Sequence, residues 1–382
     1  MTRSRLGAIV GVAESDLGVV GPERTPLQLQ AQAARAALEE AGLTLHDVDG
    51  VFSAGGDAWS PTMAIAEYLG ITPRWSDATN IGGSSFDAHV GHAVTAIRAG
   101  HCEVALITYG STQRSLRSRT LARSGEVRGP GQFELIWGLP LPVAAYALAA
   151  TRHMHVYGTT SEQLAEVAVA TRAWAALNPK AYYRDPITIA DVLASPLISS
   201  PLHLLDCCLV TDGGGAVVVT SEAVAASTRK PPVWVLGHGE AHTHLTIASM
   251  SDLTVTPAAL SGPVAMAMAG VSHAELDVVE LYDSFTITVI ETIESLGFCG
   301  PGEGGSFVAG QRTAPGGEFP LNTNGGGLSY CHPGMYGIFL LIEATRQLRG
   351  ERGEAQVPDA RLALVNGTGG VLSSCATVVL GV

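Results

Sequence analysis

A tyrosine and an aspartate stand together where the chain leaves a buried strand. Tyr282 and Asp283 directly follow the apolar stretch 278–281, whose composition is typical of such a strand. A phenol and a carboxyl group at a strand end are well placed to exchange protons with a ligand. A half-buried tyrosine whose hydroxyl is hydrogen-bonded for structural reasons would explain the same residues. These residues alone leave both interpretations open.

A glycine-rich loop further along the chain carries a second group of reactive side chains. These side chains belong to Tyr330, Cys331 and His332, and Pro333 follows them. Three consecutive glycines, 325–327, precede them, and glycine lets a backbone approach a ligand closely. From Gly337 to Gly350 apolar residues recur every three or four positions, which predicts a buried helix. The alternative is a structural turn in which His332 bonds a backbone group.

Composition limits the classes of function. The chain has 382 residues, of which 46% are apolar and 15% charged, with a net charge of −13. This length suffices for two domains, and the acidic balance argues against nucleic-acid binding. No apolar run reaches the roughly 18 residues that a membrane span needs. The N-terminus predicts a first strand and no signal peptide, and the scattered cysteines fit a reducing compartment, so we expect a cytoplasmic protein.

Strands and helices are predicted to alternate along the chain. The expected strands cover residues 6–12, 48–54, 104–109, 216–220 and 278–281. The expected helices cover residues 26–41, 62–69, 86–99, 141–157 and 161–177, followed by the one after Gly337. This alternation predicts mostly parallel α/β sheets with helices on their faces.

The second half of the chain repeats the first. Residues 41–52 align without gaps on residues 269–280, and residues 105–112 align on residues 363–370. Because the two pairs occur in the same order, they indicate two copies of one α/β unit. In such folds ligands bind where strands end, so loops from both copies can meet at one site.

A linker and an irregular insertion divide the chain. The basic, proline-rich run 229–232 predicts a boundary between an N-terminal half, 1–228, and a C-terminal half, 229–382. Within the first half, a loop domain is expected over about 111–205. Five arginines crowd its first part, 111–131, which is typical of a solvated surface loop, although arginine also matches phosphate or a partner.

Other polar residues carry weaker signals. His238, His242 and His244 resemble metal ligands on a strand, but no cluster of carboxylates or cysteines joins them, so the sequence predicts no metal site. Asp212 with the glycines after it could cradle a phosphate, although a turn is the simpler interpretation.

The glycine-rich loop resembles the thiolase superfamily. Its residues fit the family form Asn-x-x-Gly-Gly followed by Gly-His-Pro-x-Gly-x-x-Gly, at Asn322, Gly325, Gly326, His332, Pro333, Gly334 and Gly337. Cys331 stands where the family usually has glycine. The run Tyr282-Asp283-x-Phe285 is similar to the His-Asp-x-Phe of sterol carrier protein X-type thiolases. The resemblance covers nearly the whole chain and implies a thiolase fold: duplicated βαβαβαββ halves in a five-layer αβαβα arrangement, usually dimeric.

The chain departs from that family where a thiolase carries its nucleophile. A thiolase needs a cysteine thiolate to take the acyl group. By the family spacing this position falls on Gly83, and the second cysteine's place is taken by Asn366. Ser84 and Ser85 are adjacent, but no base stands next to them, and unactivated serine is a poor nucleophile.

These departures resemble the cysteine-less, thiolase-like aldolases of steroid side-chain breakdown. That branch implies retro-aldol cleavage of a β-hydroxyacyl-CoA, assisted by a small OB-fold partner that carries zinc and binds acyl-CoA. By this analogy Tyr282 or Tyr330 would be the base, and His332 would donate to the enolate oxygen. Asn322 would help to place the enolate, and Asp283 would orient a neighbouring group.

The resemblance also sets expectations for binding and assembly. The residues expected to contact substrate are Gly83, Ser84, Ser85, Gly326, Cys331 and Gly369. A CoA thioester would be the substrate, with no covalently bound cofactor. A homodimer is expected, and the arginine-rich loop could contact a partner. Two alternatives remain: a Claisen-type acyltransferase such as an acetyl-CoA acetyltransferase, and a non-catalytic acyl-CoA or lipid-binding subunit.

Overall fold

The protein is described by a computed structural model that covers residues 5–55, 58–117, 132–139 and 142–382. The strands of its main sheet are β1 (Gly7–Glu14), β2 (Gly50–Ser53), β3 (Trp75–Asp77), β4 (Val104–Ser111), β7 (Gly213–Thr220), β8 (Val233–His242), β9 (Val278–Leu281), β10 (Leu362–Gly369) and β11 (Ser374–Gly381). A separate pair is formed by β5 (Leu197–Ser199) and β6 (Leu202–His203).

Helices connect and cover these strands. They are α1 (Pro26–Ala41), α2 (Pro61–Leu69), α3 (Ser85–Arg98), α4 (Gln132–Leu135), α5 (Pro142–Tyr157), α6 (Ser161–Leu177), α7 (Ile189–Ala194), α8 (Glu222–Ala225), α9 (Ala258–Ala269), α10 (Thr286–Ser295), α11 (Gly304–Val308) and α12 (Gly337–Leu348). The predicted helices and strands all form, with ends that move by a few residues. The predicted mostly parallel pairing is wrong, because antiparallel pairs predominate in the main sheet. No helix among the described residues is long and apolar enough to cross a membrane.

The sheet shows the duplication that the sequence repeats predicted. Its order is β3-β2-β4-β7-β1-β8-β11-β10-β9. In the first half β2 runs parallel to β4, which pairs antiparallel with β7, and β7 pairs antiparallel with β1. The second half repeats this pattern. There β9 runs parallel to β10, β10 pairs antiparallel with β11, and β11 pairs antiparallel with β8. The aligned segments therefore occupy equivalent places in the two copies.

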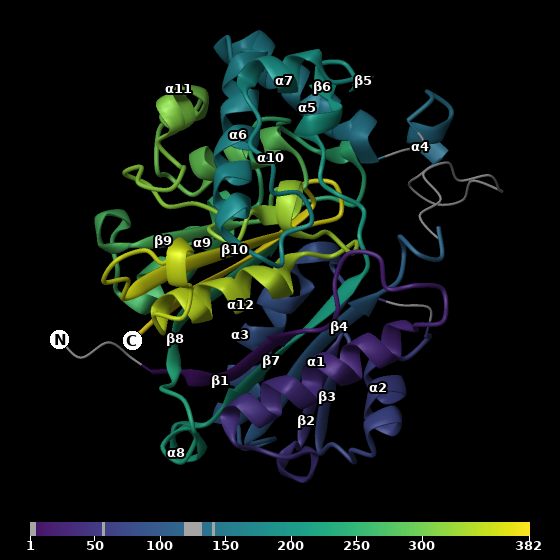
Figure 1. Ribbon diagram of the computed structural model, residues 1–382, viewed down its shortest axis with the longest axis vertical. Coiled ribbons are helices and arrows are strands. Elements are labelled where there is room, and N and C mark those ends of the chain that lie inside the picture. The colour runs from purple at the N-terminus through teal and green to yellow at the C-terminus, as the bar shows by residue number, and fades with distance from the viewer. Residues whose placement is uncertain (1–4, 56–57, 118–131, 140–141) are drawn as a thin grey trace.

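The two sets of strands enclose a central helical layer. Helices α3 and α12 contact strands of both halves, whereas α1 packs mainly on first-half strands and α9 mainly on second-half strands. In Figure 1, α3 and α12 lie between the strands labelled β1, β7 and β4 and those labelled β9 and β10. The helix and strand layers alternate as the family resemblance implied. The two sheets are joined into one, because β1 pairs with β8 across the middle.

Local sequence signals explain where helices start and stop. Thr25 caps α1 by accepting from the backbone N–H of Gln28, whose side chain bonds back to Thr25, and Pro26 takes the first helical position. Thr160 caps α6 in the same way. Gly42 ends α1 at a φ of 77°, a conformation that glycine adopts without a steric cost.

A histidine between two carboxylates links the first half to the second. His92 on α3 lies 2.6 Å from Asp77 on β3 and 3.0 Å from Glu240 on β8. Hydrogen bonds from Asp77 and Glu240 raise the pKa of His92 to about 9. The other titratable groups that act on this cluster are His89, His238 and His242.

This linkage predicts a pH-dependent stability. The raised pKa of His92 stabilises the fold fully below the unfolded value of 6.5, and the stabilisation is lost as pH rises through about 9. Because the cluster is partly exposed, we expect it to contribute about 1–2 kcal/mol. His92→Gln should therefore lower the free energy of unfolding at pH 6 but hardly at pH 10, as measured by urea denaturation. The exposed His155→Gln is the matched control, and an equal loss at both pH values would contradict the prediction.

Candidate active site

A cavity of about 240 Å³ opens where strands of the second half end. Its lining comes from the turn before α3, the start of α5, the ends of β9 and β10, and the glycine-rich loop. The lining residues are Gly82, Gly83, Pro142, Tyr146, Cys208, Tyr282, Ser284, Phe285, His332, Gly334, Met335, Thr368, Gly369 and Gly370. The cavity thus lies at strand ends, where loops of both halves meet, as the fold class predicted.

Tyr282 and His332 form a hydrogen-bonded pair in this cavity. The Tyr282 hydroxyl lies 2.7 Å from His332 Nε2 and 3.3 Å from the carbonyl oxygen of Gly334. Both side chains are almost fully buried, and burial raises the pKa of the Tyr282 phenol well above its usual range. A phenol in this setting does not ionise readily by itself, so the imidazole beside it is the natural acceptor for its proton.

Backbone contacts fix both members of the pair. The backbone N–H of His332 donates to Thr211 Oγ1 at 2.9 Å, and its carbonyl oxygen accepts from the Thr211 N–H at 3.2 Å. The N–H of Tyr282 donates to the carbonyl oxygen of Asn366 at 3.0 Å. The pair is therefore held in place by two further segments of the chain, one at Thr211 and one at Asn366.

A side chain at position 83 would need the space that the Tyr282 ring fills. A Cβ atom at position 83 would lie 1.8 Å from Tyr282 Cε1 and 2.6 Å from the backbone oxygen of Thr368. Neither distance is compatible with a side chain at this position unless both the Tyr282 ring and the backbone at Thr368 move. The position to which the sequence analysis assigned the missing nucleophile is therefore one where the tyrosine ring leaves room only for glycine.

The turn before α3 supplies an electropositive wall. Gly82–Ser84 form a single 3₁₀ turn that leads into α3. The first N–H groups of a helix lack intrahelical partners, and the helix N-terminus carries a partial positive charge. Asp87 lies in the first turn, but burial raises its pKa well above the usual carboxyl range, so it does not offset that charge. A developing oxyanion would be stabilised here.

Asp283 and Asn322 hold the glycine-rich loop and do not line the cavity. Asp283 accepts from the backbone N–H groups of Gly327 and Leu328 at 2.6 and 3.1 Å. Asn322 Oδ1 accepts from the N–H of Leu281 at 2.7 Å. A Cβ at position 326 would lie 2.0 Å from Asp283 Oδ2, so Gly326 lets the loop close over this carboxyl group. These three residues act on the shape of the loop.

Tyr330 and Cys331 also lie outside the cavity lining. The Tyr330 hydroxyl donates to Glu14 Oε1 at 2.8 Å. Burial alone would raise the pKa of Glu14, but Arg346 and Lys180 hold it far below its usual range. Tyr330 is thus bound to a buried ion cluster. Cys331 is fully buried, which raises the pKa of its thiol.

Of the other four residues expected to contact substrate, two line the cavity and two do not. Gly83 and Gly369 line the cavity, whereas Ser84 and Ser85 do not. The Ser84 hydroxyl lies 2.8 Å from the Ser374 hydroxyl and 3.1 Å from the carbonyl oxygen of Ile81. The Ser85 hydroxyl donates to the carbonyl oxygen of Gly82 at 2.6 Å. Both serines therefore stabilise the turn before α3.

Four polar residues of the cavity were not predicted from the sequence. They are Tyr146, Cys208, Ser284 and Thr368. Tyr146 lies on α5 within an alanine-rich helical pattern, and Cys208 lies in an irregular run. Neither stands in a local motif. Ser284 stands inside the recognised Tyr282–Phe285 run, so its position there was an available signal.

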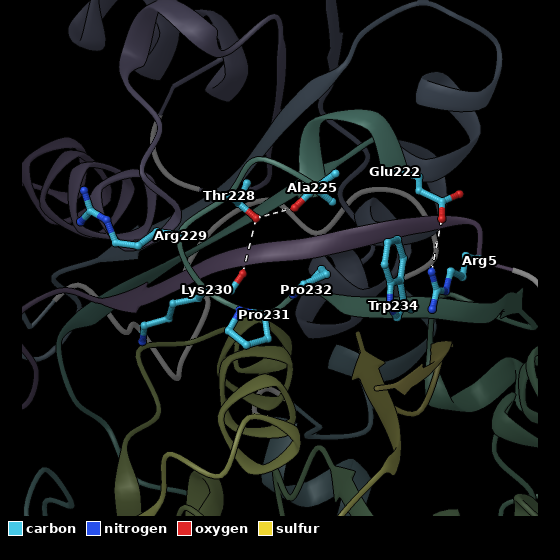
Figure 2. Close-up of a pocket in the computed structure, with 10 residues that line it drawn as sticks. Arg5, Glu222, Ala225, Thr228, Arg229, Lys230, Pro231, Pro232 and Trp234 are labelled. Atoms are coloured by element: carbon cyan, nitrogen blue, oxygen red, sulfur yellow. Dashed lines mark hydrogen bonds and ion pairs between the residues drawn. The ribbon is translucent and has the colours of Figure 1, made fainter.

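A second cavity, of about 370 Å³, lies at the predicted linker (Figure 2). Its three cationic side chains already have partners. Arg5 pairs with Glu222 at 3.3 Å, Arg229 donates to the carbonyl oxygen of Glu39 at 3.0 Å, and Lys230 pairs with Glu351 at 2.9 Å. None of its lining residues lines the first cavity. Its contacts tie the linker to both halves.

The three histidines that resemble metal ligands in the sequence lie on β8 or just after it. His238 and His242 lie on β8, and His244 follows it, with a ring nitrogen 3.0 Å from the carbonyl oxygen of Val371. Within the described ranges, no group of three or more histidines, cysteines or carboxylates could hold a metal ion.

Comparison with known proteins identifies the family. A family model described as thiolase C-terminal domain-like matches residues 239–382. The chain is 36% identical to the 17-hydroxy-3-oxo-4-pregnene-20-carboxyl-CoA lyase of Mycobacterium tuberculosis, over 90% of this chain and 91% of that protein. The chain belongs to the thiolase superfamily.

Within the superfamily it falls in the sterol carrier protein 2 thiolase-like branch. It is 35% identical to a steroid side-chain-cleaving aldolase of Thermomonospora curvata, over 90% of each protein. A solved structure titled Ltp2-ChsH2(DUF35) aldolase matches with a TM-score of 0.89 at 33% identity, over 98% of this chain and 97% of the other. The resemblance read from the sequence is confirmed, and the thiolase fold with it. This thiolase-like chain is an enzyme of the superfamily.

Proposed function

We propose that this thiolase-like enzyme cleaves a β-hydroxyacyl-CoA by a retro-aldol reaction that uses no cysteine nucleophile. The observation that carries the proposal is the mutual exclusion of Tyr282 and a side chain at position 83. A thiolase places its thiolate there, whereas a retro-aldol cleavage needs no acyl-enzyme and instead needs a base and an enolate stabiliser. Kinship with a lyase and an aldolase that act on steroid side chains supports the same reaction class.

The base is the hydrogen-bonded pair. Tyr282 takes the proton of the substrate β-hydroxyl as its own proton passes to His332 Nε2, 2.7 Å away. This relay avoids a free phenolate in a buried site, because the positive charge forms on the imidazole. Two tyrosines fit this role by sequence, and the cavity lining favours Tyr282 over Tyr330.

The enolate oxygen faces the turn before α3. As the bond between Cα and Cβ breaks, the β-oxygen becomes a carbonyl and negative charge develops on the thioester oxygen. The N-terminus of α3 at Gly83 is suited to bind that oxygen. His332, which the sequence analysis assigned to the enolate, instead serves the relay through its contact with Tyr282.

Product analysis tests the proposal. A CoA thioester with an α-methyl group, and with a β-carbon that carries a hydroxyl and two methyl groups, should yield acetone and propionyl-CoA without added CoA. A β-ketoacyl-CoA with free CoA should yield no thiolysis products. Cleavage of the β-ketoacyl-CoA alone, dependent on free CoA, would refute the lyase assignment in favour of an acyltransferase.

The acyltransferase alternative has one supporting observation. Cys208 lines the cavity, so a thiol is present although none stands at position 83. Cys208→Ser should leave the lyase reaction within a few-fold of the parent enzyme. Abolition of every CoA-dependent activity in this variant, with folding intact, would instead favour Cys208 as an acyl carrier.

We further propose that the enzyme is a homodimer that works with a small acyl-CoA-binding partner carrying an OB-fold and zinc. The matched aldolase structure is titled as a complex with a DUF35 protein, which supports a partner of this kind. Of the arginine-rich loop expected to contact it, residues 111–117 are described, and the remainder, 118–131, lies outside the described residues. No free cofactor is required by this chemistry, and we assign the enzyme to the cytoplasm.

A further inference from the structure

The proposed retro-aldol reaction needs a second proton operation that the relay does not supply. After cleavage, the enolate must take a proton at Cα before the acyl-CoA product can leave. No lysine, arginine, aspartate or glutamate among the described residues lines the cavity. The titratable groups that do so are Tyr146, Cys208, Tyr282 and His332. Since Tyr282 and His332 receive the β-hydroxyl proton, the other two titratable side chains of the lining, Tyr146 and Cys208, are the candidate donors.

Tyr146 has the properties of a proton donor at a fixed place. It reaches the cavity from α5, is 3% exposed, and its ring packs against Phe285 with centroids 4.4 Å apart. Its hydroxyl lies 3.3 Å from the carbonyl oxygen of Gly370. Burial raises its pKa to about 12, so it holds its proton at neutral pH.

The two tyrosine hydroxyls are held by different segments. His332 and Gly334 of the glycine-rich loop fix the Tyr282 hydroxyl, whereas Gly370, after β10, fixes that of Tyr146. Gly370 in turn abuts the turn before α3, since a Cβ at Gly82 would lie 2.5 Å from the Gly370 nitrogen. The Tyr146 hydroxyl therefore lies near the same turn that would bind the enolate oxygen.

We propose that Tyr146 is the general acid that protonates Cα of the thioester enolate. This assignment rests on the proposed lyase function and adds a catalytic residue to it. The long hydrogen bond to Gly370 is weak enough to be exchanged for a contact with substrate. The stack on Phe285 keeps the phenol oriented while that exchange takes place.

The proton balance closes. The β-hydroxyl proton passes to Tyr282, and the Tyr282 proton passes to His332. The electron pair of the broken bond forms the enolate, which takes the Tyr146 proton at Cα. His332 then carries a positive charge and Tyr146 a negative one in the same cavity, so the two charges balance there. Exchange with water after product release restores both groups. No redox partner is involved.

The stereochemistry of the product tests this role. In D₂O, the α-methyl substrate described above should give propionyl-CoA with one deuterium in a single configuration. Tyr146→Phe should lower kcat by about 10²-fold or more and make the remaining deuterium stereorandom, because water then protonates the enolate. Tyr157→Phe, on the same helix but outside the cavity, is the matched control and should change neither quantity.

A second variant at position 146 tests the same role if Tyr146→Phe fails to fold. A difluorotyrosine at position 146 keeps the shape of the side chain but is a stronger acid, so the alkaline limb of kcat should move to lower pH. An unchanged limb, or unchanged rate and stereochemistry in Tyr146→Phe, would overturn the role of Tyr146. Absence of any cleavage by the parent enzyme would instead overturn the proposed function, so the two failures are distinguishable.

Discussion

Tyr282→Phe is expected to lower kcat for β-hydroxyacyl-CoA cleavage by about 10²–10⁴-fold, the range typical of a lost general base. The substitution removes only the hydroxyl that lies 2.7 Å from His332 Nε2. The ring keeps its place beside Gly83, so packing and stability should change little. KM should change less than kcat, because the hydroxyl acts mainly in the transition state.

Tyr330→Phe is the matched control for that experiment. Its hydroxyl is equally buried but donates to Glu14, outside the cavity lining. We expect kcat to stay within a few-fold, with a loss of stability of about 1.5–3 kcal/mol, because the missing hydrogen bond is to an ionised carboxylate. Steady-state kinetics and urea denaturation of both variants measure the contrast. A large loss of kcat in Tyr330→Phe, with Tyr282→Phe near normal, would reverse the assignment.

Part of the site could be predicted because it lies in short, continuous motifs. Tyr282 and His332 stand beside a strand end and within a glycine-rich loop, and the family spacing pointed to Gly83. Tyr330 was open to the same interpretation, since it stands two residues before His332. Its partner Glu14 is 316 positions away in the sequence, and no local pattern indicates that contact.

The residues that the sequence could not indicate depend on long-range packing. Tyr146 reaches the cavity because α5 packs against α10, whose preceding segment carries Phe285. Ser84 was expected to contact substrate, but its hydroxyl lies 2.8 Å from that of Ser374, 290 residues later, and no local pattern indicates that contact. The fold behaved similarly: short repeats predicted the two copies, but not that β1 and β8 would pair and join their strands into one sheet.

Adding a side chain at Gly83 is expected to be the most damaging single change to the site. In Gly83→Ala the new Cβ would lie 1.8 Å from Tyr282 Cε1, so the ring must leave its place. The hydroxyl then loses its alignment with His332, and kcat should fall by about 10²-fold or more. Overpacking of this kind typically costs about 1–3 kcal/mol of stability.

A double-mutant cycle isolates that clash from other effects of the substitution. Tyr282→Ala removes the ring, so Gly83→Ala in that background should cost much less stability than it does alone, and the two changes should couple by about 1 kcal/mol or more. Some cost remains, because the backbone oxygen of Thr368 would still lie 2.6 Å from the new Cβ. Tyr282→Phe should give no such relief, since the ring stays. Because the exclusion between these two positions is what separates this site from one with a cysteine nucleophile, full activity and stability of Gly83→Ala would remove the main structural support for the lyase assignment.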